Sequence, residues 1–150
     1  MDETVCRVWL SLALRPGSAN AKLFDRFDSA ADVWHASADE LKEAGAKDGL
    51  VSRLTDKDLS QAARIAEFAD RYRVSLITLK DPAYPDLLRG IPDPPFLLYV
   101  LGRLPDFEKT LSVGVVGTRD MTEYGFETAY RVGYRLASAG VAVVSGMARG

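Results

Sequence analysis

Residues 112–150 constrain the fold of this 150-residue chain more than any other part. A valine-rich run at 113–116 is typical of a parallel strand covered on both faces. A glycine-containing turn, a helical pattern and a second valine-rich run at 141–144 follow it. Two strands joined by a helix form a βαβ unit, so this stretch predicts two neighbouring parallel strands.

The segment between these strands has the signals of an amphipathic helix at residues 123–139. Thr122 is a candidate N-cap, and Gly140 stands where a glycine commonly follows a helix. Apolar residues recur on one face at helical spacing. The large members of this face, which we expect to contact the sheet, are Phe126, Tyr130 and Leu136.

The two turns that leave the strands are the candidate functional site. Ligands of open parallel sheets collect at the carboxyl ends of the strands, where free backbone N–H groups favour anions. Each turn offers a small residue, a hydroxyl and an arginine, a combination suited to a phosphate. The candidate DNA- or phosphate-binding residues are Gly117, Thr118 and Arg119 in the first turn, and Ser145, Gly146, Met147, Ala148, Arg149 and Gly150 in the second.

A purely structural interpretation of these turns stays open. Any βαβ protein needs glycine at such positions, and Arg119 could pair with Asp120 or Glu123 beside the helix. The spacing matches neither the dinucleotide-binding fingerprint nor the P-loop. The residues alone therefore indicate an anion site without naming a ligand.

Four segments in order resemble one known family. The motifs V-G-T-R-x-x-T-x-Y-G at 116–125 and V-V-S-G-M-A-x-G at 143–150 follow a lead-in of Y-P-x-x-L-x-x-I-x-D-P-P at 84–95 and L-Y-x-x-G at 98–102. Together they resemble the DNA-processing protein A family (DprA, also called Smf) over about the last 70 residues. In that family the two turns line a basic pocket in a Rossmann-like domain that holds single-stranded DNA.

The resemblance implies a function and partners. It implies a non-enzymatic protein that binds and protects single-stranded DNA and loads the RecA recombinase, in DNA uptake, natural transformation and recombination. It also implies a homodimer of the full-length protein, with no cofactor. The family's domain continues well beyond the second turn, so we expect this chain to be the N-terminal part of a longer protein.

Residues 1–72 predict a bundle of short helices, comparable to the SAM-like or helix-hairpin-helix-like domain that often precedes the Rossmann-like domain in the family. Ser29 and Ser37 are candidate N-caps, and Ser37 forms a capping box with Glu40. The hairpin at 14–18 resembles a helix-hairpin-helix element, but it lacks the second glycine. A structural or protein-contacting bundle is therefore favoured over a duplex binder. One apolar face of the first helix is predicted to contain Val5, Val8, Trp9 and Leu12.

Residues 73–111 connect the two regions. Strands are predicted at 74–79 and 96–101, with a stiff proline-rich connection at 81–95 between them. We expect both strands to join the same sheet as those near 112–117 and 141–145. The predicted organisation is thus α/β, with a helical bundle at 1–72 and the first half of a Rossmann-like parallel sheet domain at 73–150, truncated at its C-terminal end.

Composition excludes several other classes of function. The net charge of −2 shows no basic face, so DNA binding has to rest on a local pocket. The single cysteine, Cys6, predicts a core residue and a cytoplasmic protein, and no apolar run is long enough for a membrane span. One cysteine and His35, the single histidine, cannot form a metal site, and no nucleophile-elbow motif is present.

A second function stays open beside DNA binding. Nucleotide-handling enzymes of the lysine-decarboxylase-like phosphoribohydrolase kind have a related Rossmann-like fold. Their G-G-x-G-T-x-x-E signature has no match in the sequence. Hydrolysis of nucleoside monophosphates by the full-length protein would favour this alternative.

Overall fold

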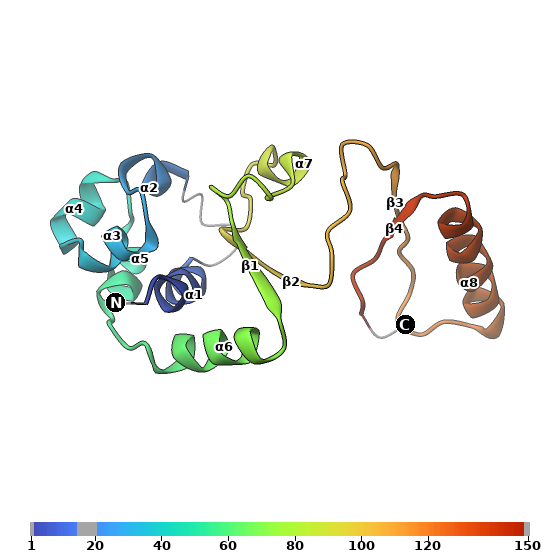
Figure 1. The fold of residues 1–150 in the computed structure, drawn as a ribbon, viewed down its shortest axis with the longest axis horizontal. Helices are drawn as coiled ribbons and strands as arrows, with labels where there is room; N and C mark the ends of the chain where they lie inside the picture. Colours follow the sequence, from blue (N-terminus) through green and yellow to red (C-terminus); the bar gives the residue numbers. More distant parts are fainter. Residues whose placement is uncertain (1, 15–20, 149–150) are drawn as a thin grey trace. The chain divides into compact units, whose positions relative to one another are not determined.

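The computed structural model describes residues 2–14 and 21–148. The chain divides into two compact units, Met1–Arg103 and Leu104–Gly150, and each is described here by itself. Figure 1 shows that the first unit contains most of the helices and the second contains one helix beside two short strands. The chain is therefore mixed α/β, as the sequence predicts.

The first unit begins with a series of helices. Their bounds are α1 (Glu3–Ala13), α2 (Ala21–Arg26), α3 (Ala30–His35), α4 (Ala38–Glu43), α5 (Asp48–Thr55) and α6 (Ser60–Arg71). The capping predictions for α3 and α4 are confirmed, since Ser29 and Ser37 each form a complete capping box, with Asp32 and Glu40 respectively. The chain leaves the α4 region through Gly45, whose φ of 89° suits glycine.

The core of the first unit lies between these helices. It includes Val8, Leu10, Val33, Leu41 and Leu54, each no more than 1% exposed. The predicted face of α1 is partly wrong, because Leu12 is exposed whereas Cys6, Leu10 and Ala13 are buried. The buried face is rotated because α1 contacts α3, α5 and α6, which cover more of its surface than one stripe. The predicted hairpin at 14–18 lies largely outside the described residues.

A two-stranded antiparallel sheet completes the first unit. β1 (Val74–Thr78) pairs with β2 (Leu97–Leu101), and α7 (Asp86–Arg89) lies on the connection between them. Two side chains hold this proline-rich connection. The hydroxyl of the buried Tyr84 donates to the carbonyl of Pro95 at 2.7 Å, and the Arg89 guanidinium donates to the carbonyls of Leu79, Asp81 and Tyr84.

The prediction of one common sheet is wrong for the described residues. β1 and β2 form their own sheet, and the strands of the second unit form another. The apolar residues of β1 and β2 explain the difference, because Leu97 is part of the helical core and Leu76 and Phe96 pack against it. These strands therefore bury their apolar faces against the helices that precede them.

The second unit is the predicted βαβ unit. β3 (Ser112–Gly114) and β4 (Ala142–Val144) are parallel neighbours, and α8 (Glu123–Ser138) connects them (Figure 1). Thr122 caps α8 by accepting from the Gly125 N–H at 3.1 Å, so this capping prediction is confirmed. Gly140 follows the helix with a φ of 77°, a conformation that favours glycine.

The predicted sheet-facing stripe of α8 is only partly correct. Phe126 and Tyr130 are 55% and 67% exposed, whereas Leu136 is half-buried. Together with Leu136, the partly covered positions on α8 are Gly125, Thr128 and Gly133. A sheet of two three-residue strands covers only this narrow side of the helix, and the two aromatic rings lie outside it.

Candidate nucleic-acid interface

The two predicted turns leave adjacent strands in the same direction. Gly114 pairs with Val144 at the ends of β3 and β4, and the Val115 N–H extends the ladder by donating to the Val144 carbonyl at 2.9 Å. Because the strands are parallel, the segments at 117–119 and 145–148 both begin at the carboxyl edge of this small sheet. The local topology that the anion-site prediction requires is therefore present.

Both segments are open to solvent. Gly117, Thr118, Arg119 and residues 145–148 are all exposed. A methyl group added at Gly117 or Gly146 would meet no heavy atom within 4 Å among the described residues. Packing inside this unit therefore does not explain these glycines.

The second segment contains a predicted site residue, Met147, whose backbone conformation the sequence did not predict. Met147 has a φ of 47°, the left-handed region that few residues other than glycine, asparagine and aspartate adopt. Its side chain is 94% exposed, so the side chain is not what holds the backbone in this conformation. No sequence signal distinguishes this methionine from one in an ordinary loop.

Arg119 has no intramolecular partner in the described part of the chain. Neither Asp120 nor Glu123 forms an ion pair with it at 4.0 Å or less, although both are near in sequence. The alternative in which Arg119 merely pairs on the shoulder of α8 therefore receives no support. The remaining predicted residues, Arg149 and Gly150, lie outside the described residues.

The start of α8 adds a partial positive charge near the first segment. The helix has 16 residues and begins four positions after Arg119, at Glu123. Its first N–H groups are partly satisfied by the Thr122 cap, and the helix dipole favours an anion in front of this end. A guanidinium, a hydroxyl and exposed backbone N–H groups thus belong to one strand–turn–helix connection.

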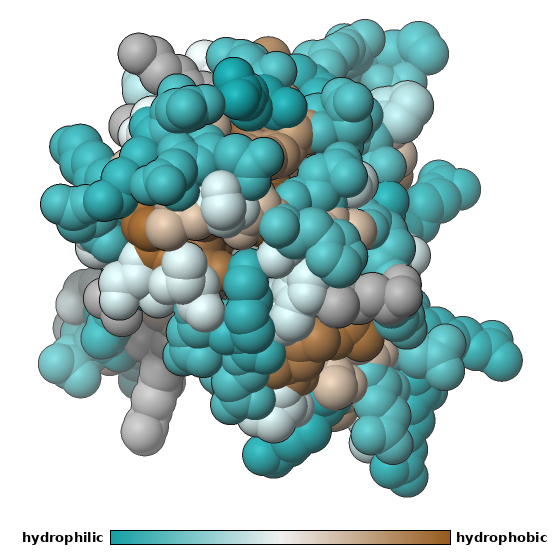
Figure 2. Space-filling view, turned by 90° about the vertical axis from the view of Figure 1, so that its left-hand side faces the viewer, coloured by the Kyte–Doolittle hydropathy of each residue, from teal (hydrophilic) through white to brown (hydrophobic). Residues whose placement is uncertain are grey.

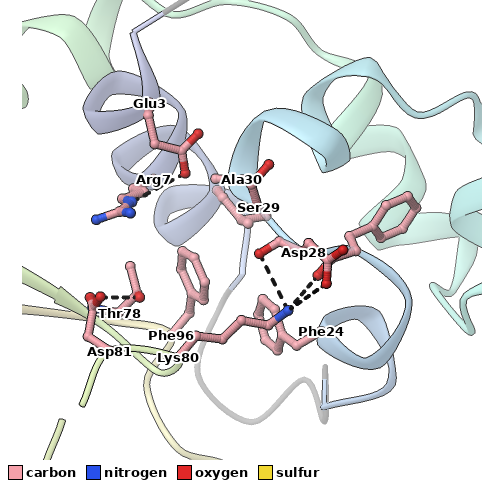
Figure 3. Close-up of a pocket in the computed structure, with 12 residues that line it drawn as sticks. Glu3, Arg7, Phe24, Asp28, Ser29, Ala30, Thr78, Lys80, Asp81 and Phe96 are labelled. Atoms are coloured by element: carbon pink, nitrogen blue, oxygen red, sulfur yellow. Dashed lines mark hydrogen bonds and ion pairs between the residues drawn. The ribbon is translucent and has the colours of Figure 1, made fainter. Parts of the chain in front are cut away.

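A hollow in the first unit is a second place where charged groups meet (Figure 3). It is lined by both cations and anions, but these groups already have partners. Lys80 donates to the carbonyls of Phe27 and Asp28 at 2.8 and 3.4 Å, and Arg7 donates to Glu3 at 3.2 Å. The stacked rings of Phe24 and Phe96, 4.9 Å apart, pack in its wall. The interactions of the hollow are therefore those of a packed junction between helices and β1.

The remaining candidates for chemistry are structural. Burial raises the pKa of the Cys6 thiol, which is typical of an inert core cysteine. His35 is exposed at the end of α3, and Trp9 and Trp34 pack edge to face at 4.9 Å. The described residues contain no group of three potential metal ligands. Within the same ranges, no helix is both long and apolar enough to cross a membrane.

One family model and several known proteins are similar to this chain. The family model described as DNA recombination-mediator protein A matches residues 75–150. A protein Smf from Synechocystis sp. is 31% identical over 137 residues, which are 86% of this chain and 34% of that protein. The DNA processing protein DprA of Bacillus subtilis is 32% identical over 77 residues, 51% of this chain and 26% of that protein.

A third relative, a protein Smf from Borreliella burgdorferi, is 38% identical over 80 residues, or 53% of this chain and 25% of that protein. The chain thus spans between a quarter and about a third of the length of these relatives. The family match includes both candidate turns and the lead-in motif. The chain therefore belongs to the DNA recombination-mediator protein A family.

Proposed function

We propose that the whole protein is a non-enzymatic mediator of DNA recombination that binds single-stranded DNA and delivers it to the RecA recombinase. The segments at 117–119 and 145–150 are its proposed DNA-binding elements. In this proposal residues 1–72 form a helical domain and residues 73–150 the first part of a Rossmann-like domain. The full-length protein acts as a cytoplasmic homodimer, in DNA uptake and natural transformation as well as recombination.

One observation carries this proposal. Two exposed segments begin at the carboxyl edge of two adjacent parallel strands. Both contain glycine and a hydroxyl group, and the first also contains an unpaired arginine. Arginine and exposed N–H groups at such an edge recognise phosphate oxygens. Membership of a DNA recombination-mediator family makes a DNA phosphate the relevant anion.

The same arrangement supports binding without sequence specificity. Phosphate contacts fix the register and orientation of a strand but read no bases. Arg119 would fork onto one phosphate, while N–H groups near Gly117 and Gly146 take other oxygens. A protein that protects incoming strands of any sequence needs this kind of contact.

The test is a salt titration of single-strand binding with the full-length protein. Arg119→Ala should weaken binding about equally for different oligonucleotide sequences. It should also flatten the dependence of log K on log salt by about 0.7, which corresponds to one phosphate contact on a single strand. Fluorescence anisotropy of a labelled oligonucleotide at several salt concentrations measures both.

Arg135→Ala is the matched control. Arg135 is also an exposed arginine on the βαβ unit, but it lies in the last helical turn of α8. The segment with Arg119 precedes the other end of this helix. This variant should leave the salt slope within error of wild type. If Arg119→Ala leaves both affinity and slope unchanged, Arg119 is not part of the DNA site.

A further inference from the structure

The outward face of α6 combines aromatic rings and arginines that folding does not use. One side of this helix packs against α1 and β1 and buries only alanines, Ala62, Ala66 and Ala69. Beside this buried side, Phe68 and the C-cap residue Tyr72 are 58% and 52% exposed. Rings of this size are usually buried where a core is available to them, so their exposure calls for an explanation.

The two rings form one exposed aromatic surface. Phe68 and Tyr72 are one helical turn apart, and their ring centroids lie 4.3 Å from each other with the planes tilted by 36°. This contact keeps both exposed rings close together at the C-terminal end of α6. A planar group can therefore stack on a pre-arranged pair, with less side-chain entropy lost on binding.

Two arginines flank the rings and keep their hydrogen-bonding capacity. Arg64 lies one turn before Phe68, and it has no hydrogen bond or ion pair among the described residues. Arg71 lies over the Tyr72 ring at 5.8 Å, a cation–π contact that leaves its N–H donors available. Glu67 is within three or four positions of both arginines, yet it forms no salt bridge with either of them.

Several other arginines of this unit are already engaged, in contrast to Arg64 and Arg71. The Arg7 and Arg26 side chains pair with Glu3 and Glu43. The Arg53 guanidinium donates to the Ala13 carbonyl at 2.8 Å. On the outward face of α6, in contrast, exposed rings and unpaired guanidinium groups occur together.

We propose that this face, formed by Arg64, Phe68, Arg71 and Tyr72, is a second binding surface for single-stranded nucleic acid. Bases stack on the aromatic pair, and the guanidinium groups contact the adjacent phosphates, the combination that binds single strands without reading their sequence. This inference rests on the proposed function, because it gives the same ligand a second contact on the helical unit. It assigns a role to the helical unit that its sequence does not indicate.

The composition of the face favours a nucleic-acid strand over a protein partner. A standard protein interface covers about 800 Å² on each partner and has an apolar core. Here the exposed apolar surface on α6 is limited to two rings, both next to arginines, and no exposed large aliphatic side chain lies on the helix. A narrow aromatic stripe between cations fits a flexible strand better than a broad protein surface.

The experiment uses full-length protein and a fluorescein-labelled oligothymidylate. The oligonucleotide is longer than the stretch that the segments at 117–119 and 145–150 can bind, so that part of it remains free to reach α6. Phe68→Ala and Tyr72→Ala should each weaken binding by about tenfold, a change that corresponds to about 1.4 kcal/mol and lies within the range for one stacked base. Arg64→Ala and Arg71→Ala should each flatten the salt slope by about 0.7. Phe68→Tyr and Tyr72→Phe keep a ring at each position and should retain wild-type affinity.

A crosslinking readout locates the contact independently of affinity. An oligonucleotide containing iodouracil reacts on irradiation with aromatic rings stacked on it. Peptide mapping should place crosslinks at Phe68 or Tyr72, and Arg119→Ala should reduce their yield without moving them. Crosslinks confined to residues other than Phe68 and Tyr72 would overturn the proposal.

The remaining outcomes separate the two proposals. If wild type binds the oligonucleotide and Arg119→Ala weakens it, but the ring variants bind like wild type, only the α6 proposal fails. If the ring variants instead lose binding of an oligoglutamate peptide and keep that of the oligonucleotide, the face is a protein-docking surface and the α6 proposal is wrong. If wild type binds no single-stranded DNA, both proposals fall.

Discussion

The two units of this chain use similar helices in very different ways. α1 has 11 residues and buries five of them, whereas α8 has 16 residues and buries none. α1 is surrounded by α3, α5 and α6, whereas the main packing partner of α8 within its unit is β4. An amphipathic sequence thus specifies a buried face only where enough neighbouring elements exist to cover it.

The comparison changes how exposure should be interpreted at the candidate site. Leu111, Val116, Tyr124 and Met147 are all more than 70% exposed in the second unit, so an exposed side chain there is ordinary. The exposure of Arg119 is therefore weak evidence on its own. What marks the site is the position of both turns at one edge of a parallel pair, a feature that depends on backbone pairing.

Exposure in the first unit carries more information. Most large apolar side chains there are buried in one core, and the surface seen in Figure 2 is largely hydrophilic, with separate hydrophobic areas. Phe68 and Tyr72 are two of the exceptions to this pattern, together with side chains such as Leu87 and Leu101. What distinguishes the two rings is their contact with each other and the neighbouring Arg71, so the inference rests on that combination rather than on the exposed fraction alone.

The largest expected effect tests the difference in packing directly. Leu54 is fully buried in the core of the first unit, so Leu54→Ala should lower the free energy of unfolding by about 2–5 kcal/mol. Leu136 is only half-buried against the small sheet, so Leu136→Ala should cost distinctly less. Urea unfolding of both variants measures the two changes.

Leu87→Ala is the control for this pair, because Leu87 is 69% exposed and its loss should be nearly neutral. An equal cost for Leu54→Ala and Leu136→Ala would break the comparison. It would mean that Leu136 is buried by surfaces beyond the two strands and the helix of its unit.

A smaller effect is expected from the helix caps. Ser37 and Thr122 each accept a hydrogen bond from a backbone N–H near the start of a helix, at 3.3 and 3.1 Å. Ser37→Ala should cost about 1 kcal/mol of global stability, because α4 unfolds together with the core it packs on. Thr122→Ala should instead increase hydrogen exchange at the start of α8 and change global unfolding less. Equal effects on global unfolding would show that both units unfold as one.

The local structure of both units could be predicted from the sequence. Caps at Ser29, Ser37 and Thr122, and the helix ending before Gly140, depend on neighbouring residues and are confirmed. The parallel pair of β3 and β4 was predictable for a related reason, since a βαβ connection leaves few alternatives.

The sequence did not predict which strands pair with each other or which elements pack together. The apolar pattern of β1 and β2 fits either a parallel sheet or a hairpin-like pair against helices, and tertiary packing selects the second. The same limitation applies to α8, where the sequence shows an apolar face but not how much of it a two-stranded sheet can cover. Of the candidate site, the strand ends were predictable, but the left-handed conformation of Met147 and the free guanidinium of Arg119 were not.

The smallest expected effect concerns a carboxylate of the first unit and depends on pH. Partial burial raises the pKa of Asp81, but hydrogen bonds from the Thr78 N–H and hydroxyl, at 2.6 and 2.8 Å, and the charge of Arg7 lower it more, so the pKa lies below its ordinary value. Because folding lowers this pKa, the ionised carboxylate stabilises the folded chain. That contribution is complete above the ordinary pKa of about 3.9 and is lost as the pH falls through the lower folded pKa.

Asp81→Asn tests this contribution. The amide keeps one oxygen acceptor but not the charge, so we expect a loss of less than about 1 kcal/mol at pH 7 and a smaller loss near pH 3. Asp70→Asn is the matched control, because the Asp70 carboxylate is exposed on α6 and has no hydrogen bond among the described residues. Urea unfolding of wild type and both variants at pH 7 and pH 3 gives the change in unfolding free energy for each variant at each pH. If the cost of Asp81→Asn grows as the pH falls, the carboxylate destabilises the end of β1 when ionised.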